Sequence, residues 1–317
     1  MKVVFIDTVH PVLKDRLSNN GFSCIDATNM DRKSCYALLK DADGIVIRSK
    51  YHLDSNFLGH APGLKFIARS GAGLENIDTA YCAKNGIEVF NSPEGNRNAV
   101  GEHALGMLLA LFNNLTRADR EIREGKWNRE QNRGVELKGK TVGIIGYGNN
   151  GTAFANKLKG LDVSVMAYDK YKKGFGNDFV TETDLGGIQD NADVVSLHIP
   201  ENEETHYFVD ALFLNAFKKP IYLINLSRGK IVNTSALNKA IHSKKVIGAC
   251  LDVLEYEKTD FESIIEKDMD TDLYDLLHSE KVILSPHIGG WTIESYFKLS
   301  DVLADKILNQ FAAIVNN

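Results

Sequence analysis

Three side chains that could handle protons and carboxylates each follow a short apolar segment: Arg228, Glu257 and His287. A carboxylate beside an imidazole stabilises its charged form, so a His–Glu pair can act as a general acid and base. A guanidinium can hold a substrate carboxylate through two parallel hydrogen bonds. A structural salt bridge is the alternative for Arg228 taken alone. Together the three residues predict proton transfer on a substrate that carries a carboxylate.

A glycine-rich turn predicts a dinucleotide site. It reads Gly146-Tyr147-Gly148-Asn149-Asn150-Gly151 and lies between an apolar strand and a helical pattern. The first glycine allows the turn, the second leaves no side chain between backbone and pyrophosphate, and the third lets the helix pack close to the strand. The free N–H groups of the helix N-terminus then face an anion.

Asp169 ends the next predicted strand, residues 163 to 168. A carboxylate there accepts hydrogen bonds from a ribose diol and repels a 2′-phosphate, which predicts NAD rather than NADP. Lys170, Lys172 and Lys173 could instead clamp a 2′-phosphate. A solvated loop is the interpretation that we favour, because Asp169 would lie against that phosphate.

Two α/β domains are needed to position these residues. Residues 1 to 98 alternate short apolar strands with helical stretches and predict a small parallel sheet. From residue 142 to residue 284, about six strands predict a second sheet with the strand count of a Rossmann fold. An amphipathic last helix, 294 to 315, is expected to pack on the first domain.

The connections are also readable. Pro and Gly predict a linker at residues 91 to 96, and apolar spacing predicts one long helix from 100 to 122 that stops at Gly125. The acidic stretch 258 to 280 is interpreted as a solvated excursion. Its segment 268 to 272 imitates a calcium loop but lacks the required glycine and final glutamate, so no metal site is predicted.

Composition narrows the class of protein. The 317 residues predict about two domains, and 44% hydrophobic with 25% charged residues is ordinary for a globular protein. A net charge of −5 argues against nonspecific nucleic-acid binding. The N-terminus is interpreted as a strand rather than a signal peptide, and no apolar run is long enough to span a membrane. Four scattered cysteines predict a cytoplasmic location.

A second glycine-rich turn, Arg69 to Gly73, follows a predicted strand of the first domain. The backbone N–H groups of Gly71, Ala72 and Gly73 could cradle a carboxylate. A plain strand-to-helix turn is an equally good interpretation of the pattern.

The motifs resemble those of the NAD-dependent D-isomer-specific 2-hydroxyacid dehydrogenases. The resemblance implies that Arg228, Glu257 and His287 are catalytic, that the substrate is a small 2-hydroxyacid or 2-oxoacid, and that the chain forms a homodimer through the helix starting near Val100. The chain departs from the family's pattern at Lys258, where a proline is usual, and at Asn150, where an isoleucine is usual. The resemblance rests on the segments ARSGAGLENID, NSPEGNRNAVGEHALG, KGKTVGIIGYGNNG, VVSLHIP, INLSRGKIVN, GACLDVLEYE and LSPHIGG.

The resemblance also implies a domain division and an active site in the cleft between domains. Residues 1–98 and 290–317 would form a flavodoxin-like substrate domain split across the termini, and residues 99–289 an NAD-binding Rossmann domain. Beyond Asp169, further NAD contacts are expected at the fingerprint residues Gly146, Tyr147, Gly148, Asn149, Asn150 and Gly151, and at His198, Pro200, Thr205, Leu226, Ser227, Asp252 and Gly289.

The substrate is least determined by the sequence. Arg48 and Arg69 end neighbouring predicted strands, and Arg129 resembles an arginine that reaches a partner's substrate in phosphoglycerate dehydrogenases. Three cations suit a phosphate and favour D-3-phosphoglycerate over D-lactate or glycerate, whereas pairing with surface carboxylates is the alternative. No regulatory domain is expected after residue 317, and hence no serine feedback. A rival class is an NAD-sensing binding protein of the co-repressor type.

Overall fold

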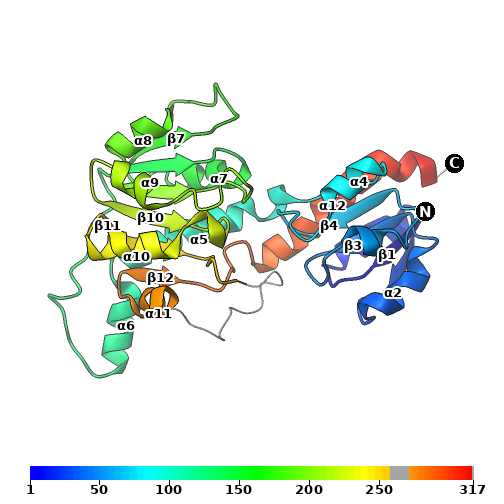
Figure 1. The fold of residues 1–317 in the computed structure, drawn as a ribbon, viewed down its shortest axis with the longest axis horizontal. Helices are drawn as coiled ribbons and strands as arrows, with labels where there is room; N and C mark the ends of the chain where they lie inside the picture. Colours follow the sequence, from blue (N-terminus) through cyan, green and yellow to red (C-terminus); the bar gives the residue numbers. More distant parts are fainter. Residues whose placement is uncertain (258–270, 316–317) are drawn as a thin grey trace. The chain divides into compact units, whose positions relative to one another are not determined.

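A computed structural model describes residues 1–257 and 271–315 of the chain. The chain divides into two compact units, one comprising Met1–Asn96 with Trp291–Asn317 and the other Arg97–Gly290. Each unit is built on its own parallel sheet (Figure 1).

The first unit contains a five-stranded parallel sheet with the order β2-β1-β3-β4-β5. This is the flavodoxin-like order, in which the chain reverses direction across the sheet between β1 and β3. Its elements are β1 (Lys2–Phe5), α1 (Val12–Asn19), β2 (Ser23–Asp26), α2 (Arg32–Leu39), β3 (Gly44–Ile47), α3 (Ser55–Leu58), β4 (Phe66–Arg69), α4 (Thr79–Lys84), β5 (Glu88–Phe90) and α12 (Ile293–Val315).

Alternating side chains give this sheet two buried faces. Val4 and Ile67 face the core under α2, α3 and α4, whereas Val3 and Phe66 face the core under α1 and α12. Helix α12, at the red end of the chain in Figure 1, therefore completes the unit from the far end of the sequence, as predicted.

The second unit contains a seven-stranded parallel sheet with the order β12-β11-β10-β9-β6-β7-β8, a Rossmann arrangement that reverses between β6 and β9. Its elements are α5 (Pro93–Phe112), which begins in the first unit, α6 (Leu115–Arg123), β6 (Thr141–Ile145), α7 (Asn149–Lys157), β7 (Ser164–Tyr168), β8 (Val180–Glu182), α8 (Leu185–Asn191), β9 (Val194–Leu197), α9 (Ala211–Ala216), β10 (Ile221–Asn225), the 3₁₀ turn η1 (Gly229–Ile231), α10 (Thr234–His242), β11 (Val246–Leu251), α11 (Thr271–His278) and β12 (Val282–Leu284).

Helices cover both faces of the second sheet. One core contains side chains of α8, α9, α10 and α11, and the other contains side chains of α5 and α7. No helix in the described part of the chain is long and apolar enough to cross a membrane. The predicted fold class, two parallel-sheet α/β domains, is confirmed.

Four predictions about individual strands, helices and connections were wrong in detail. The second sheet has seven strands because the three-residue edge strand β8 escaped the apolar pattern. The predicted linker contains the start of α5, since Pro93 suits the first turn of a helix. The predicted long helix is broken at Asn114, whose φ of 51° is not helical, and the separate helix α6 begins after it. Finally, Thr271–His278 is helix α11 with Leu273 and Leu276 buried, not a solvated excursion.

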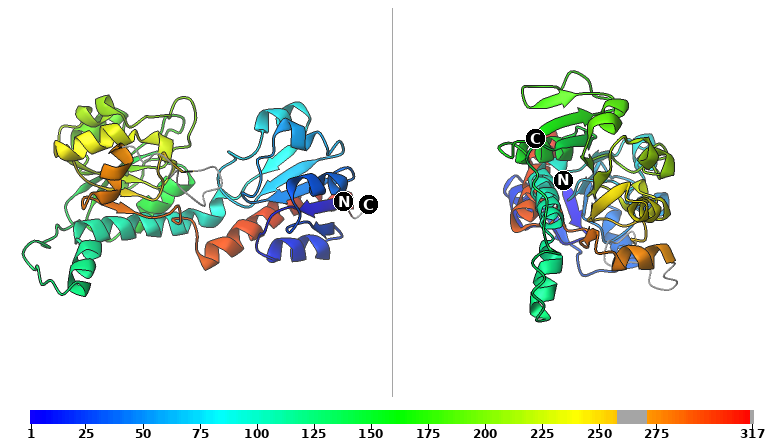
Figure 2. Two further views of the ribbon diagram at one scale, coloured as in Figure 1. Left: turned by 60° about the horizontal axis from the view of Figure 1, so that its bottom comes forward. Right: turned by 90° about the vertical axis from the view of Figure 1, so that its left-hand side faces the viewer.

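The rest of the acidic stretch and most of the calcium-like segment, residues 258–270, lie outside the described residues. Helix α6 projects from the second unit as an arm, and the loop that follows it returns to β6 (Figure 2). Gly125, with a φ of 76°, lies just after the end of α6, as predicted.

Replacing Leu303 with Ala tests the contribution of α12 to the first unit. The side chain is fully buried beside Phe66 and Val3, so the cavity should lower the free energy of unfolding by about 2 to 4 kcal/mol in urea denaturation. Ile293→Ala, at a side chain that is 88% exposed on the same helix, is the control and should change stability by less than about 0.5 kcal/mol. Equal effects from the two variants would contradict the packing described.

Candidate active site

His287 and Glu257 are in contact. Nδ1 of the imidazole lies 2.9 Å from Oε2 of the carboxylate, and the side chains are 23% and 16% exposed. The other carboxylate oxygen accepts a hydrogen bond of 2.6 Å from the backbone N–H of Leu254, which fixes the carboxylate's orientation. The predicted His–Glu pair is therefore present.

The neighbouring acid, Glu255, has a different set of partners. Its Oε2 accepts hydrogen bonds from the backbone N–H and the hydroxyl of Thr234, at 2.8 Å and 2.6 Å. Its Oε1 accepts one of 3.1 Å from the Tyr207 hydroxyl. Glu255 thus holds the start of α10, which leaves Glu257 as the acid that faces His287.

The turn that carries His287 is fastened to Asp252, a side chain only 2% exposed. Asp252 Oδ1 accepts from the Ser285 hydroxyl at 2.6 Å and from Ile288 N–H at 2.9 Å, and Oδ2 accepts from Gly289 N–H at 2.7 Å. The backbone N–H of His287 donates to the Asp252 carbonyl at 2.8 Å. These four bonds hold the backbone of His287 at a φ of 55°, a conformation that residues other than glycine seldom adopt.

Sequence reasoning missed two members of this network. His103 Nε2, on α5, lies 2.9 Å from the Ser285 hydroxyl oxygen, and Ser285 in turn donates to Asp252. Both lie in motifs that carried the family resemblance, but helical periodicity identified only the apolar face of α5. A polar residue on the buried side of that helix was the available signal.

Arg228 follows β10, and both its backbone carbonyl and its guanidinium form hydrogen bonds within the loop. The Asn225 side chain donates to the Arg228 carbonyl at 2.9 Å, and the guanidinium donates to the Ser227 carbonyl at 2.6 Å. The Ser227 hydroxyl donates to the Leu197 carbonyl at 2.7 Å. A Cβ on Gly229 would lie 1.9 Å from the Leu254 carbonyl oxygen, so the loops after β10 and β11 touch there.

The three predicted catalytic residues follow β10, β11 and β12, which are adjacent in the sheet. Because the carboxyl ends of parallel strands meet at one edge, all three lie on the edge that also carries the glycine fingerprint after β6. The sheet therefore brings a His–Glu pair and an arginine to the edge where open α/β sheets bind ligands.

The fingerprint turn is built for close approach. Gly146 has a φ of 90°, and a Cβ there would lie 2.3 Å from the His198 carbonyl oxygen. A Cβ on Gly151 would lie 2.0 Å from the Gly146 carbonyl oxygen, whereas one on Gly148 would meet nothing within 4 Å. The first and last glycines thus serve packing, and the middle one leaves open space against the backbone where a pyrophosphate fits. Asn149 and Asn150 begin α7, and the buried Oδ1 of Asn150 has no partner among the described residues.

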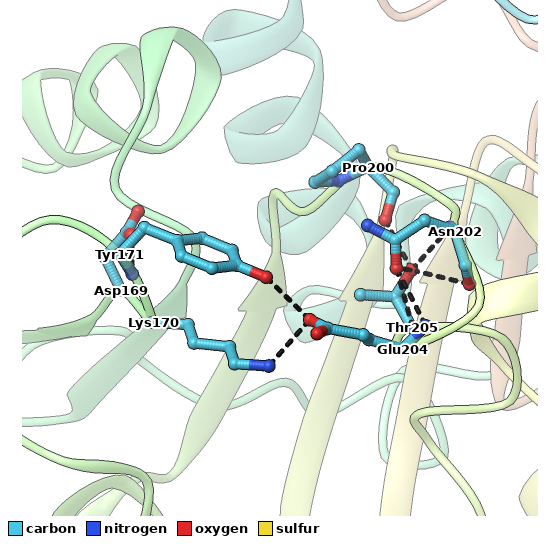
Figure 3. Close-up of polar contacts among 7 residues, drawn as sticks. All are labelled: Asp169, Lys170, Tyr171, Pro200, Asn202, Glu204 and Thr205. Atoms are coloured by element: carbon cyan, nitrogen blue, oxygen red, sulfur yellow. Dashed lines mark hydrogen bonds and ion pairs between the residues drawn. The ribbon is translucent and has the colours of Figure 1, made fainter. Parts of the chain in front are cut away.

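Asp169, drawn in Figure 3, directly follows β7, the strand next to β6 in the sheet. Its carboxylate accepts backbone N–H bonds from Tyr147 at 2.8 Å, Tyr171 at 3.0 Å and Lys172 at 2.9 Å. Burial raises the pKa of Asp169, but the N–H bonds from Lys172, Tyr147 and Tyr171 outweigh burial and lower the pKa overall. The carboxylate is charged and tied to the turn, and Tyr147 stacks on Phe175 at 4.6 Å.

Two of the predicted residues after β9, Pro200 and Thr205, lie in one loop (Figure 3). The Thr205 hydroxyl donates to the Pro200 carbonyl at 2.6 Å and so closes the loop. His198 Nε2 lies 2.9 Å from the Ser196 hydroxyl, and burial lowers the pKa of His198 to about 4. His198 is therefore neutral at physiological pH. Leu226 is buried and lies against Gly289, the two remaining predicted contacts.

The predicted substrate residues of the first unit are arranged around Arg48. Asp7, a buried residue after β1, accepts the backbone N–H of Arg48, Ser49 and Lys50 at 3.0, 2.7 and 2.8 Å. The guanidinium of Arg48 lies over the Trp291 ring, 4.9 Å from the ring centroid. A cation in this position is attracted by the negative face of the ring.

Arg69 and the glycine-rich turn are less available than predicted. Arg69 is 8% exposed, donates through Nε to the Arg48 carbonyl at 3.0 Å, and packs so closely under Gly71 that a Cβ there would lie 1.9 Å from Nη1. Gly71 N–H donates to the Arg69 carbonyl at 2.9 Å. Of the three predicted cradle donors, the N–H groups of Ala72 and Gly73 remain the better candidates.

Arg129 belongs to the loop after α6. The loop is tied to the helix by Asn132, which accepts from Arg117 at 2.9 Å and donates to Glu121 at 2.6 Å. Arg129 and Trp127 line a cavity of about 200 Å³ between this loop and α6.

Known proteins place the chain in a family. The family described as "D-isomer specific 2-hydroxyacid dehydrogenase, NAD binding domain" matches residues 105–289. A D-3-phosphoglycerate dehydrogenase of Archaeoglobus fulgidus is 32% identical over 98% of this chain and 57% of its own length, so the chain spans little more than half of that relative. A hydroxypyruvate reductase of Thermotoga maritima is 31% identical over 90% of each chain.

A solved D-lactate dehydrogenase of Aquifex aeolicus, complexed with NAD and lactic acid, has a TM-score of 0.80 and 26% identity, covering 99% of this chain and 97% of that one. The chain belongs to the D-isomer-specific 2-hydroxyacid dehydrogenase family, oxidoreductases acting on CH–OH donors, and the matched domain of that family is described as NAD binding. Its relatives act on different hydroxyacids, so kinship alone leaves the substrate open.

The low pKa of His198 makes stability depend on pH. Between about pH 6.5 and pH 4 the unfolded chain binds a proton that the folded chain does not, so stability is full above pH 6.5 and falls as the pH is lowered through this window. The loss should be on the order of 3 kcal/mol. His198→Gln should remove that slope from urea denaturation curves, and His52→Gln, at an exposed site, should not. Identical slopes in wild type and His198→Gln would refute the assignment.

Proposed function

We propose that the chain is an NAD-dependent D-2-hydroxyacid dehydrogenase whose preferred substrate is D-3-phosphoglycerate. The observation that carries the activity is the His287–Glu257 pair, joined at 2.9 Å, on the sheet edge that also bears the glycine fingerprint and Asp169. When bound, NAD would exchange a hydride with C2 of the substrate. The glycine turn, with open space beside Gly148, fits its pyrophosphate.

Each catalytic residue has a proposed role. His287 acts through Nε2, because Nδ1 faces Glu257, and it removes or returns the proton of the C2 hydroxyl. Glu257 stabilises the protonated imidazole and, since Leu254 N–H fixes its carboxylate, also fixes the ring plane. Arg228 binds the substrate carboxylate and polarises the carbonyl of the 2-oxoacid.

Asp252 takes a role beyond the predicted contact with the cofactor. Because its carboxylate is filled by donors from the turn of residues 285–289, we propose that it keeps His287 in the conformation that faces Glu257. The contacts of His198, Thr205, Leu226 and Ser227 with NAD remain proposals of the same kind.

The phosphorylated substrate is supported chiefly by Arg48. Its backbone is fixed by Asp7 and its guanidinium lies over Trp291, and this placement would prepare a cation for a distal anion. D-Lactate and glycerate lack such an anion and are the alternatives. Arg69 is largely buried, so it would position Arg48 through the hydrogen bond to the Arg48 carbonyl rather than bind the phosphate itself. Arg129 would contact the phosphate of a substrate bound to a partner copy.

A homodimer is proposed from the arm. Helix α6 has no buried residue in the single chain, and Leu115, Ile122 and Trp127 are 55%, 51% and 83% exposed. Apolar side chains on a projecting element favour burial against a second copy.

All four cysteines are free thiols, which supports the cytoplasmic location that we propose.

A panel of 2-oxoacids with NADH tests substrate and activity together. Phosphonooxypyruvate should give the highest kcat/KM, and Arg48→Ala should raise its KM about ten-fold or more, the loss of a charged hydrogen bond of roughly 1.5 to 3 kcal/mol, while barely changing KM for pyruvate. Lys84→Ala, which removes an exposed cation of α4, is the control. A wild type that prefers pyruvate has no phosphate site and would be a lactate-type enzyme.

A further inference from the structure

Of the four residues that follow Asp169, the acid predicted to bind the ribose, three are lysines. Cations in this place would suit the 2′-phosphate of NADP, yet each ammonium group has an acceptor inside the protein. Lys172 Nζ lies 3.3 Å from the Tyr147 carbonyl and Lys173 Nζ 3.3 Å from the Asp169 carbonyl. Lys170 Nζ lies 2.6 Å from Glu204 Oε2, and this is the one of the three contacts made with a carboxylate.

Glu204 reaches Lys170 from another loop. It follows β9, whereas Lys170 follows β7, and β6 with the fingerprint lies between these strands. The same oxygen, Oε2, also accepts a hydrogen bond of 2.6 Å from the Tyr171 hydroxyl, so two consecutive residues after Asp169 are bound to one carboxylate (Figure 3). The Glu204 contacts thus bridge the loops on either side of the glycine turn.

We propose that Glu204 helps the protein prefer NAD over NADP, by neutralising the lysine that would otherwise bind a 2′-phosphate and by adding a second negative charge near Asp169. This inference rests on the cofactor site of the proposed function. Asp169 would repel the phosphate, and Glu204 pairs with the first lysine after Asp169. On this proposal the lysine-rich loop is not a phosphate clamp, because its first lysine is paired with a carboxylate and the other two each have a backbone carbonyl as acceptor.

The pair has little structural role, which makes it testable. Lys170 and Glu204 are 54% and 53% exposed, and ion pairs this exposed contribute little to stability. Hydrogen bonds from Lys170 and then Tyr171 lower the pKa of Glu204, so the carboxylate is charged at neutral pH. Removing its charge should leave the fold intact while changing the local field.

Binding titrations of NADH and NADPH by fluorescence, without substrate, provide the test. Glu204→Gln should tighten NADPH binding roughly five-fold and change NADH binding by less than about two-fold. The gain should shrink at high salt, because an exposed ammonium–phosphate contact is screened. Equal changes for the two nucleotides, or none for NADPH, would overturn the inference.

Two further variants separate the mechanism from general charge effects. In a Lys170→Ala background, Glu204→Gln should no longer tighten NADPH binding, and persistence of the gain would show that Glu204 does not act through Lys170. Tyr171→Phe, which keeps the ion pair, should leave the NADH to NADPH ratio unchanged. If the wild type binds NADH but Glu204→Gln leaves the preference for NADH over NADPH unchanged, this inference alone is wrong. If the wild type binds no NADH, the cofactor assignment falls with it.

Discussion

The candidate active site depends on one buried carboxylate. Asp252 receives hydrogen bonds from Ser285, Ile288 and Gly289 and, through its backbone, from His287. A left-handed conformation costs a residue such as His287 on the order of 1 kcal/mol, and these bonds offset that cost. In the turn held in this way, Nδ1 meets Glu257. A buried charge with so many donors is stable where an unpaired one would not be.

Parallel sheets supply the rest of the arrangement. Because all strands of the second unit run the same way, the loops after β6, β7 and β9 and those after β10, β11 and β12 share one edge. The first three hold the fingerprint, Asp169 and the Glu204 loop, and the last three hold the catalytic candidates. Close backbone approaches at Gly146 and Gly229 keep neighbouring loops in contact at the edge where chemistry is proposed.

Much of this could be predicted from the sequence, and the failures have physical causes. Buried strands such as Ile221–Asn225 are readable because both faces are covered, which makes them continuous apolar runs. The pairing of His287 with Glu257 was predicted because both follow strands that end at one edge of the sheet, and because the motifs resemble those of the family. Edge strand β8 is too short to show a pattern, and the start of α5 was hidden because Pro and Gly also mark linkers. Bonds that depend on three-dimensional neighbours, such as His103 with Ser285 and Lys170 with Glu204, leave no local signal.

Separate measurements of cofactor binding and turnover in His287→Asn test whether His287 is the acid and base of a dehydrogenase whose cofactor is held elsewhere on the same edge. We expect kcat for 2-oxoacid reduction to fall at least about 100-fold, the usual contribution of general acid–base catalysis, while the NADH dissociation constant stays within about two-fold of wild type. Loss of NADH binding together with turnover would show that His287 serves the structure of the site, and unchanged turnover would show that the proton is handled by another group.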